Sequence, residues 1–471
     1  MKKRLFKTCL VICIASMMLM ALVGCGSTAT STTSASTVET TVSETAVATQ
    51  TETATSTEAS NVPPAPPDGA PGGAPGGGSQ SVNTGTGAYV LSDGEALNGG
   101  TYSSTNADEN AIRAEGTVTA TLNDVTVNKT SGDASSSDAS SFYGLDAAIL
   151  ALDNATLTIT GGTVTASAEG ANGVFAYDGA TINISNTTIN VTGGNAGGIE
   201  VAGGGSMYAT NLTVNSTVKA AIRSDRGGGT LVVDGGTYTT SGSSGAPAIY
   251  STADIKVSNA TLTANTSEAV VVEGLNSVTL VDCDVTGNMD GTSAEANGEN
   301  VHNVMLYQSM SGDAETGTSS FSMTGGTLVS KSGDMFYVTN TSSIISLSDV
   351  DLTLADGTYL LLVAGNDSSR GWGTAGANGG NTTFNLSKQT AVGDIMVDAI
   401  STLAMNISDS SSFTGSINSD GTSASYLVVT IDSSSTWILT ADSYVTAFNG
   451  SISNVVTNGH TLYVNGSAVT K

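Results

Sequence analysis

One short pattern recurs through the chain and decides its fold. Residues 184–189 read ISNTTI, and residues 209–214, 233–238 and 257–262 read ATNLTV, VDGGTY and VSNATL. Glycine, asparagine and aspartate tolerate a left-handed backbone better than other residues, so a Gly, Asn or Asp at the third position predicts a tight bend. Nine copies place this position at Asp124, Gly161, Asn186, Asn211, Gly235, Asn259, Asp282, Gly325 and Asp349.

A second strand accompanies each bend. Successive copies are mostly 23 to 25 residues apart, and between them a small residue is followed by an aliphatic one. These aliphatic residues are Ile112, Ile149, Val174, Ile199, Ile222, Ile249 and Val270. Strand alternation turns this row inward, and the unit is too short for a propeller blade of roughly 40 residues. We therefore predict an all-β chain folded as a single right-handed parallel β-helix of about a dozen coils.

The composition agrees with this fold and excludes some functions. The chain of 471 residues has 14 Lys plus Arg against 41 Asp plus Glu, a net charge of -27, and 57 glycines. Nucleic-acid binding needs clustered Lys and Arg, which this chain lacks, so no nucleic-acid partner is expected. Abundant Thr, Val and Ile between Gly, Asn and Asp turns is typical of strands and argues against a helical enzyme.

The first residues form an export signal. Four of the first seven residues are basic, namely Lys2, Lys3, Arg4 and Lys7. A mostly apolar run follows from Leu10 to Leu22, and small residues come next. We therefore predict a signal peptide at residues 1–24. A membrane-spanning helix is the weaker interpretation, because the Ser/Thr-rich stretch that follows lacks the features of a stop-transfer segment.

The remaining boundaries follow from composition. Residues 25–86 are rich in Ser and Thr and then in Pro and Gly, which predicts a disordered linker. We assign residues 87–425 to the β-helix and residues 426–471 to its last coils and a cap, with His460 in a turn. Of the four cysteines, only Cys283 lies in the predicted folded part, as a free buried thiol, so no disulfide framework is expected.

Two resemblances accompany these segments. LVGC at residues 22–25 resembles the lipobox of bacterial lipoproteins, which implies cleavage before Cys25, acylation of its thiol, and anchoring to the outer face of a bacterial cytoplasmic membrane, exposed at the cell surface. The coils resemble the pectin-lyase-like β-helix superfamily and its surface-lipoprotein members. That superfamily includes lyases, hydrolases, adhesins and glycan binders, so the resemblance implies a fold and leaves the activity open.

The resemblance also implies a ligand groove over one parallel sheet. Insertions at 128–146 and 286–303 precede the second strand, and those at 308–319 and 365–380 follow it, so loops are expected on both sides of that sheet. The expected floor consists of two outward rows. They are Arg113, Leu150, Phe175, Glu200, Arg223, Tyr250 and Val271, beside Glu115, Leu152, Tyr177, Ala202, Asp225, Thr252 and Glu273.

Charged residues on adjacent coils of this floor are the candidate site. Glu200, Arg223, Asp225 and Arg226 are the catalytic candidates if the protein is an enzyme, and together with Tyr177 and Tyr250 they include the expected ligand-binding residues. The carboxylates allow acid/base chemistry or Ca²⁺ binding. The resemblance to polysaccharide lyases of the superfamily implies that Arg223 or Arg226 could act as the base. The simpler interpretation, which we favour, is ordinary cross-strand ion pairing.

Two further residues have alternative roles. Trp372, in a Gly-rich insertion, is either an exposed sugar- or partner-stacking residue or a cover for the rod. His302 has no second His or Cys at ligand spacing, so no metal site is predicted there.

Two functions of different class remain open. A monomeric, non-enzymatic adhesin or carbohydrate-binding rod is favoured, with a polysaccharide or surface glycan as partner, because few candidate bases and no recognisable catalytic motif are present. The alternative is a surface-anchored polysaccharide lyase or glycoside hydrolase that acts in the groove.

Overall fold

The computed structural model describes residues 82–242, 245–296, 298–367 and 370–469. The predicted signal peptide, Cys25 and most of the linker at 25–86 lie outside these ranges. The described residues all belong to the unit Asp68–Lys471. Within these ranges, no helix combines the length and apolar character needed to cross a membrane.

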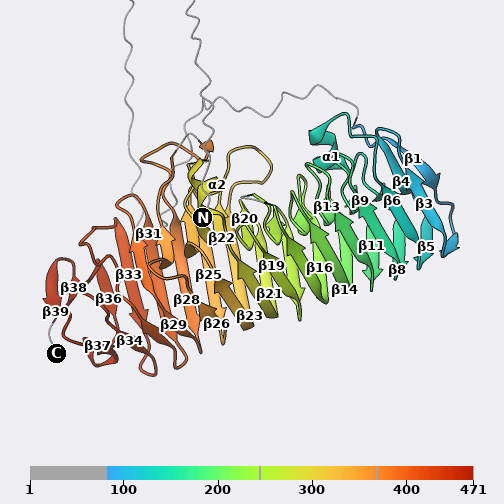
Figure 1. The fold of residues 1–471 in the computed structure, drawn as a ribbon. Helices are drawn as coiled ribbons and strands as arrows, with labels where there is room; N and C mark the ends of the chain where they lie inside the picture. Colours follow the sequence, from blue (N-terminus) through green and yellow to red (C-terminus); the bar gives the residue numbers. More distant parts are fainter. Residues whose placement is uncertain (1–81, 243–244, 297, 368–369, 470–471) are drawn as a thin grey trace, which may run out of the picture. The chain divides into compact units, whose positions relative to one another are not determined.

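Two long parallel sheets form the body of the fold (Figure 1). The 12-stranded sheet is assembled in chain order, one strand from each coil. Its strands are β1 (Thr86–Val90), β4 (Glu109–Glu115), β7 (Ile149–Leu152), β10 (Val174–Tyr177), β13 (Ile199–Ala202), β15 (Ile222–Ser224), β17 (Ile249–Ser251), β20 (Val270–Glu273), β22 (His302–Tyr307), β24 (Asp334–Thr339), β27 (Tyr359–Val363) and β30 (Asp394–Val397). Each strand from β4 to β27 therefore lies between the equivalent strands of the preceding and following coils.

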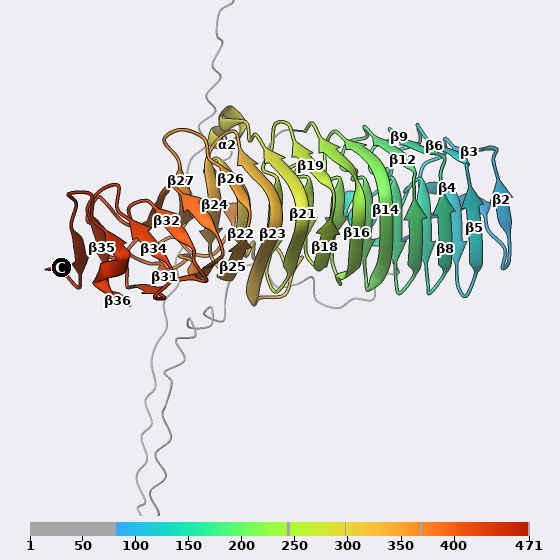
Figure 2. The same ribbon diagram turned by 90° about the horizontal axis from the view of Figure 1, so that it is seen from below.

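The second sheet has 20 strands because it bends around the coil. Its strands are β2 (Ala96–Asn98), β3 (Thr101–Ser104), β5 (Thr119–Asn123), β6 (Thr126–Lys129), β8 (Thr156–Thr160), β9 (Thr163–Ala166), β11 (Thr181–Ser185), β12 (Thr188–Val191), β14 (Gly205–Ser216), β16 (Gly229–Thr240), β18 (Asp254–Ser258), β19 (Thr261–Ala264), β21 (Ser277–Gly287), β23 (Thr318–Ser330), β25 (Ser342–Ser348), β26 (Asp351–Thr353), β28 (Asn381–Ser387), β31 (Thr402–Ser408), β33 (Tyr426–Ile431) and β36 (Ala447–Asn449). Figure 2 shows the longest of them, such as β14 and β21, curving around the coil.

The predicted bends are where the sheet turns. All nine positions of the repeat, from Asp124 to Asp349, have φ between +50° and +72°. Residues at equivalent places in neighbouring coils pair directly, for example Ile189 with Val214 and Tyr238 with Leu262. The parallel β-helix predicted from the repeat is therefore confirmed.

The core is the stack of inward aliphatic side chains. The row that begins at Ile112 and continues through Ile149 to Val270 has no exposed surface. Cys283 is also buried, as predicted. Stacking identical side chain types every ~4.8 Å buries apolar area while every backbone group pairs with the next coil.

Smaller elements complete the C-terminal end. A four-stranded sheet contains β29 (Thr390–Val392), β32 (Ser412–Thr414), β34 (Thr436–Ile438) and β37 (Val455–Val456), and a three-stranded sheet contains β35 (Ser443–Val445), β38 (Leu462–Val464) and β39 (Ser467–Val469). β38 and β39 pair antiparallel, and a short 3₁₀ helix spans Ile452–Asn454. His460 follows a turn in which its N–H donates to the carbonyl of Thr457.

Two insertions carry short helices, which lie on the same side in Figure 1. They are α1 (Ser137–Tyr143) and α2 (Gly291–Ala296). The insertion with α1 is fixed by a fully buried ion pair in which Lys129 Nζ lies 2.8 Å from Asp146 Oδ1. α1 is also tied to the coils beside it, because Asn172 donates to the carbonyl of Ser140 over 3.0 Å.

The bends can be tested with matched glycine variants. Gly162 and Gly357 have nearly equal φ, +77° and +73°, but a Cβ on Gly162 would lie 2.2 Å from the carbonyl oxygen of Val125, whereas one on Gly357 meets nothing within 4 Å. We expect Gly357→Ala to lower the free energy of unfolding by about 1 kcal/mol, the usual cost of a left-handed Ala. Gly162→Ala should lower it by at least twice as much, because a neighbouring coil must shift.

Denaturant unfolding followed by tryptophan fluorescence measures both variants. Equal losses would show that the coils stack less tightly at this bend than the structure indicates.

Candidate functional site

The predicted rows lie in the predicted register. Arg113 pairs with Leu150, Glu200 with Arg223, and Tyr250 with Val271 along the 12-stranded sheet. The expectation of an open groove along this sheet is wrong, however. Glu200, Leu150 and Phe175 have no exposed surface, and Val271 is 4% exposed. The insertions fold onto the floor that they were expected to flank.

α1 covers the coils on the N-terminal side. Leu150, Leu152, Phe175 and Ala202 form a separate apolar cluster on the outer face of the sheet. Tyr177 packs against this cluster and makes an edge-to-face contact with Tyr143 of α1, with ring centroids 5.5 Å apart. Tyr177, predicted as a ligand-binding residue, therefore lies beside the candidate site and does not line it.

Trp372 covers the coils on the C-terminal side. It is 7% exposed and packs edge-to-face on Tyr307, with ring centroids 4.8 Å apart. Val271, Met305 and Tyr337 belong to the same cluster. Of the two roles considered for Trp372, the structure shows the covering one, since the insertion folds back over the sheet.

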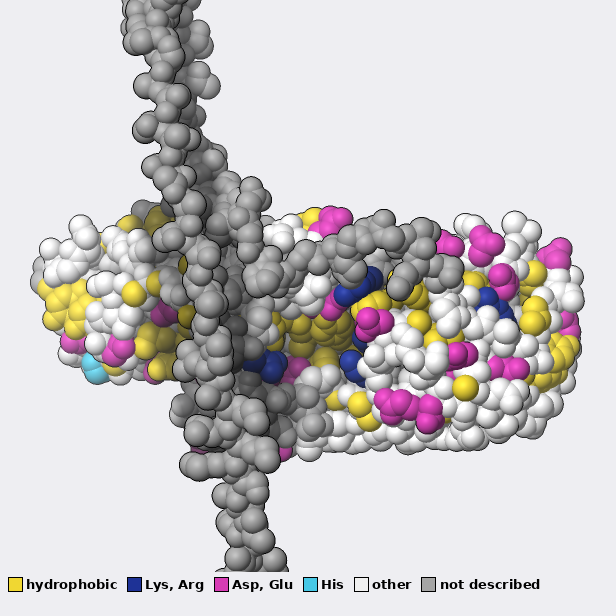
Figure 3. Space-filling model, turned by 90° about the horizontal axis from the view of Figure 1, so that it is seen from above, with side chains coloured by type: hydrophobic (Ala, Val, Ile, Leu, Met, Phe, Trp, Pro, Cys, Tyr) yellow, Lys and Arg dark blue, Asp and Glu magenta, His cyan; other side chains and the backbone are white. Residues whose placement is uncertain are grey.

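A pocket remains between these two covers. It has a volume of about 270 Å³ and is lined by Ser137, Asp138, Ser141, Phe142, Asn195, Lys219, Ala220, Arg223, Asp225, Gly245, Tyr250 and Asp313. Figure 3 looks onto this side of the molecule, where Lys and Arg side chains lie close to Asp and Glu side chains. Three of the predicted residues, Arg223, Asp225 and Tyr250, therefore line one cavity.

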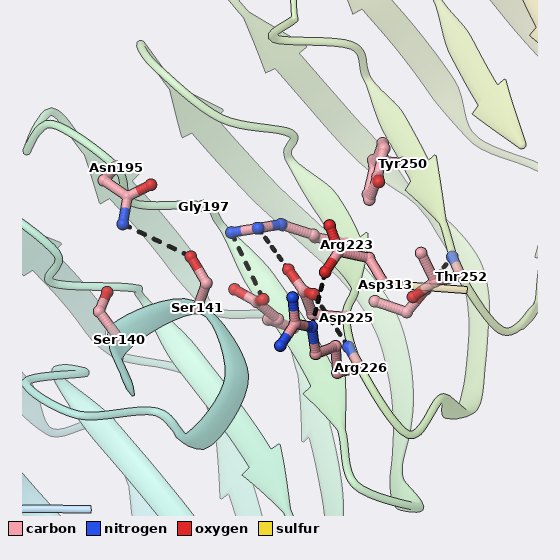
Figure 4. A network of polar contacts seen from close by, with 12 residues as sticks. Ser140, Ser141, Asn195, Gly197, Arg223, Asp225, Arg226, Tyr250, Thr252 and Asp313 are labelled. Atoms are coloured by element: carbon pink, nitrogen blue, oxygen red, sulfur yellow. Dashed lines mark hydrogen bonds and ion pairs between the residues drawn. The ribbon is translucent and has the colours of Figure 1, made fainter. Parts of the chain in front are cut away.

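Arg223 is the central polar group of the pocket (Figure 4). It is 6% exposed, and its Nη2 donates to the carboxylate of Asp225 two residues later. Its Nη1 lies 3.5 Å from Glu200 Oε1 on the neighbouring coil but has no hydrogen-bond partner among the described residues. The ion pairing that we favoured from sequence is present, yet it leaves the Nη1 group of Arg223 without a hydrogen bond among the described residues.

Glu200 lies beneath the pocket and has a strongly raised pKa. Neither carboxylate oxygen has a hydrogen-bond donor among the described residues. Burial raises the pKa of Glu200 to about 8, although the Arg223 charge opposes this effect. Burial also raises the pKa of Asp225, again against the charge of Arg223. Protons are therefore held by the carboxyl groups around Arg223 at higher pH than on ordinary acidic side chains.

Arg226 contacts two residues of the pocket lining, Asp313 and Phe142. Its Nε donates to Asp313 Oδ1 over 2.6 Å, and its guanidinium lies 4.0 Å from the ring centroid of Phe142. Asp313 belongs to the insertion after β22, whereas Phe142 belongs to α1. Arg226 thus joins the two insertions, and Figure 4 shows Asp313 and Arg226 side by side near Asp225.

Glu273 holds the side chains that bound the pocket on its C-terminal side. Its carboxylate accepts hydrogen bonds from the hydroxyls of Tyr250, Tyr307 and Ser309, of which the Tyr307 contact is 2.9 Å long. Burial raises the pKa of Glu273 despite these three donors. Tyr250 is therefore held on one side of the pocket by a residue from the next coil.

His302 and a second cavity lie farther along the sheet. His302 begins β22 and is buried, with Nδ1 2.7 Å from the carbonyl oxygen of Asn300. A cavity of about 200 Å³ is lined by Gly298, Glu299, Asn300, Tyr337, Gly365, Asn366, Asp367 and Trp372. Across the described ranges, no group of three or more His, Cys, Asp or Glu side chains is arranged to hold a metal ion.

Several lining residues were missed by the sequence analysis. Lys219, Asn195 and Asp313 lie outside the second strand of their coils, and Phe142 lies in an insertion without any repeat. The repeat predicts which residues share a row but says nothing of where an insertion packs. The one available signal was that Lys219 is among the few basic residues of the folded part.

Comparison of the chain with protein-family models, curated proteins and solved structures finds no match. The parallel β-helix is therefore shown by the structure itself, and the resemblance to the pectin-lyase-like superfamily gains no support from relatives.

The buried carboxyl of Glu200 predicts a pH dependence of stability. Because its pKa rises from 4.5 to about 8 on folding, the unfolded chain loses this proton first as the pH increases. The contribution of Glu200 to stability should therefore decline between about pH 5 and pH 8. We expect Glu200→Gln, which cannot ionise, to become more stable relative to the wild type over this interval, by a few kcal/mol in total.

Urea unfolding at pH 5, 6.5 and 8 tests this expectation. Asp356→Asn, at an exposed turn between β26 and β27, is the matched control and should follow the wild-type curve. A constant difference between Glu200→Gln and the wild type at all three pH values would contradict the buried, proton-holding state of Glu200.

Proposed function

We propose that the protein is a surface-anchored carbohydrate-binding β-helix and that the pocket over β13, β15 and β17 binds an acidic sugar. The observation that carries this proposal is the pair of cationic groups in the pocket. Lys219 forms no ion pair with any described residue, and Arg223 Nη1 lacks a hydrogen-bond partner. A ligand carboxylate can pair with Lys219 and with the part of Arg223 that lines the pocket.

The other walls suit the rest of a sugar. The carboxylates of Asp138 and Asp313 line the pocket and can accept hydrogen bonds from sugar hydroxyls. The ring of Tyr250 offers an apolar face of the kind that packs on a pyranose. A pocket with convergent polar groups and perturbed carboxyl groups is a typical place for ligand binding.

The location forms part of the same proposal. The lipobox-like LVGC motif at residues 22–25 supports anchoring through Cys25, and the Ser/Thr- and Pro/Gly-rich segment at 25–86 supports a tether that holds the β-helix away from the membrane. A binding role at the cell surface needs no catalytic group, which agrees with the internal pairing of Arg223 with Asp225.

Removal of the cationic groups tests the binding site. We expect the full chain, purified in detergent, to bind D-glucuronate or D-galacturonate but not glucose in isothermal titration calorimetry. Lys219→Ala and Arg223→Ala should each weaken binding at least tenfold, because each removes a charged partner of the carboxylate.

Lys256→Ala, at an exposed position of β18, is the matched control and should bind like the wild type. Because Arg223 is buried, circular dichroism must first show that Arg223→Ala is folded. If that variant does not fold, Lys219→Ala alone decides the test. Equal binding of glucose and glucuronate, or unchanged binding by Lys219→Ala, would contradict the proposal.

A second candidate function is a polysaccharide lyase or glycoside hydrolase at the same pocket. It is favoured by one observation, namely that Asp225 lines the pocket while burial raises its pKa, as a general acid requires. If this function holds, incubation with acidic polysaccharides releases unsaturated or reducing sugar ends, and Asp225→Asn abolishes the release. Binding without any release supports the non-enzymatic function.

A further inference from the structure

We infer that the pocket receives the end of a sugar chain or a free acidic monosaccharide, and excludes the interior of a polysaccharide. This inference rests on the proposed function and deepens it. A chain bound through its interior must leave the site in two directions, so the deciding question is whether the surface beside the pocket is open.

The N-terminal direction along the sheet is closed. The next outward residues of the floor, Phe175 and Leu150, have no exposed surface. The turn after α1 presses on them so closely that a Cβ on Gly144 would lie 2.6 Å from Leu150 Cδ1. α1 is itself held in place, because Asn195 donates to the carbonyl of Ser137 over 3.1 Å. No sugar ring can occupy these coils without displacing α1.

The C-terminal direction is closed by a wall with an internal hydrogen-bond network. The floor residues Val271 and Met305 are 4% and 2% exposed, beneath the cluster that contains Tyr307 and Trp372. Glu273 binds the hydroxyls of Tyr250 and Tyr307 together. A sugar that extended in this direction would have to displace the indole of Trp372 and break the buried hydrogen bonds of Glu273. The loss of these contacts would cost free energy.

The pocket is also bounded across the strands. Lys219 and Asn195 precede β15 and β13, whereas Asp225 and Arg226 follow β15 and meet Asp313. Arg226 spans from Asp313 to the ring of Phe142 and so ties the insertion after β22 to α1. Residues from both ends of the strands therefore line the same cavity, and the two insertions meet above it.

The volume agrees with a single sugar. At about 270 Å³ the pocket lies below the range of ~300–1,000 Å³ that holds drug-sized ligands, so it suits one ring with its carboxylate. Because Lys219 and Arg223 lie inside this volume, the ring that bears the carboxylate must be the one that enters. The rest of a bound chain must project away from the protein.

Chain length provides the test. Calorimetry with D-galacturonate, trigalacturonate and polygalacturonate should give dissociation constants for the monomer and the trimer within about threefold of each other. Polygalacturonate should bind in proportion to its number of chain ends, so partial hydrolysis of a fixed mass should increase the amount bound. An affinity that rises tenfold or more from monomer to trimer, with polymer binding set by mass alone, would overturn the inference.

The variant Arg226→Ala gives an independent measurement. Arg226→Ala removes the link between the two insertions, and we expect the ratio of trimer to monomer affinity to increase at least threefold as longer chains gain access. Lys256→Ala serves as the control and should leave this ratio unchanged. An unchanged ratio in Arg226→Ala would show that Arg226 does not restrict access.

The outcomes separate this inference from the proposed function. If no acidic sugar of any length binds, the proposed function fails. If acidic sugars bind with an affinity that grows along the chain, the proposed function stands and only the restriction to chain ends is wrong.

Discussion

The parallel register between successive coils is the constraint on which the rest of the structure depends. Each coil pairs with the next at equivalent residues, so one inward row and one outward row run the length of the 12-stranded sheet. This register brings Glu200 beside Arg223 although 22 residues separate them along the chain. A shift of one residue on either strand would turn one of these two polar side chains into the aliphatic core, where burial without a partner is costly.

The sequence predicts this register well, and for a physical reason. Left-handed bends accept few residue types, and inward positions accept only aliphatic ones, so both leave a periodic signal that can be read without a structure. The nine bends and the row from Ile112 to Val270 are therefore found where predicted. The insertions have no such period. Whether Phe142 and Trp372 pack on the sheet or point to solvent depends on contacts made once in the molecule, which is why a groove was expected where a pocket exists.

The pocket places two cationic side chains, beside three carboxyl groups, within a strongly acidic chain. The whole sequence carries a net charge of -27, which repels anionic ligands at long range and low ionic strength. Inside the pocket, however, Lys219 and Arg223 face the cavity at short range, where screening by salt is weak. The long-range charge opposes the approach of a highly charged polymer more than that of a ligand with one carboxylate. A ligand with one carboxylate therefore meets less long-range repulsion than a polyanion, which agrees with the small size of the pocket.

Glu200 and Arg223 differ from their neighbours in the outward row, and from Arg113, whose guanidinium has hydrogen-bond partners. Where the insertions cover the sheet, the outward row holds Leu150, Phe175 and Val271, which pack without polar groups. Glu200 and Arg223 occupy the same row and are equally buried, yet they leave carboxylate and guanidinium atoms without hydrogen bonds. Apolar residues in place of such buried polar groups are often neutral or stabilising, so stability alone does not account for Glu200 and Arg223. A local departure that costs stability is expected where a site needs it, and here it lies directly beneath the one lined by Lys219 and Tyr250.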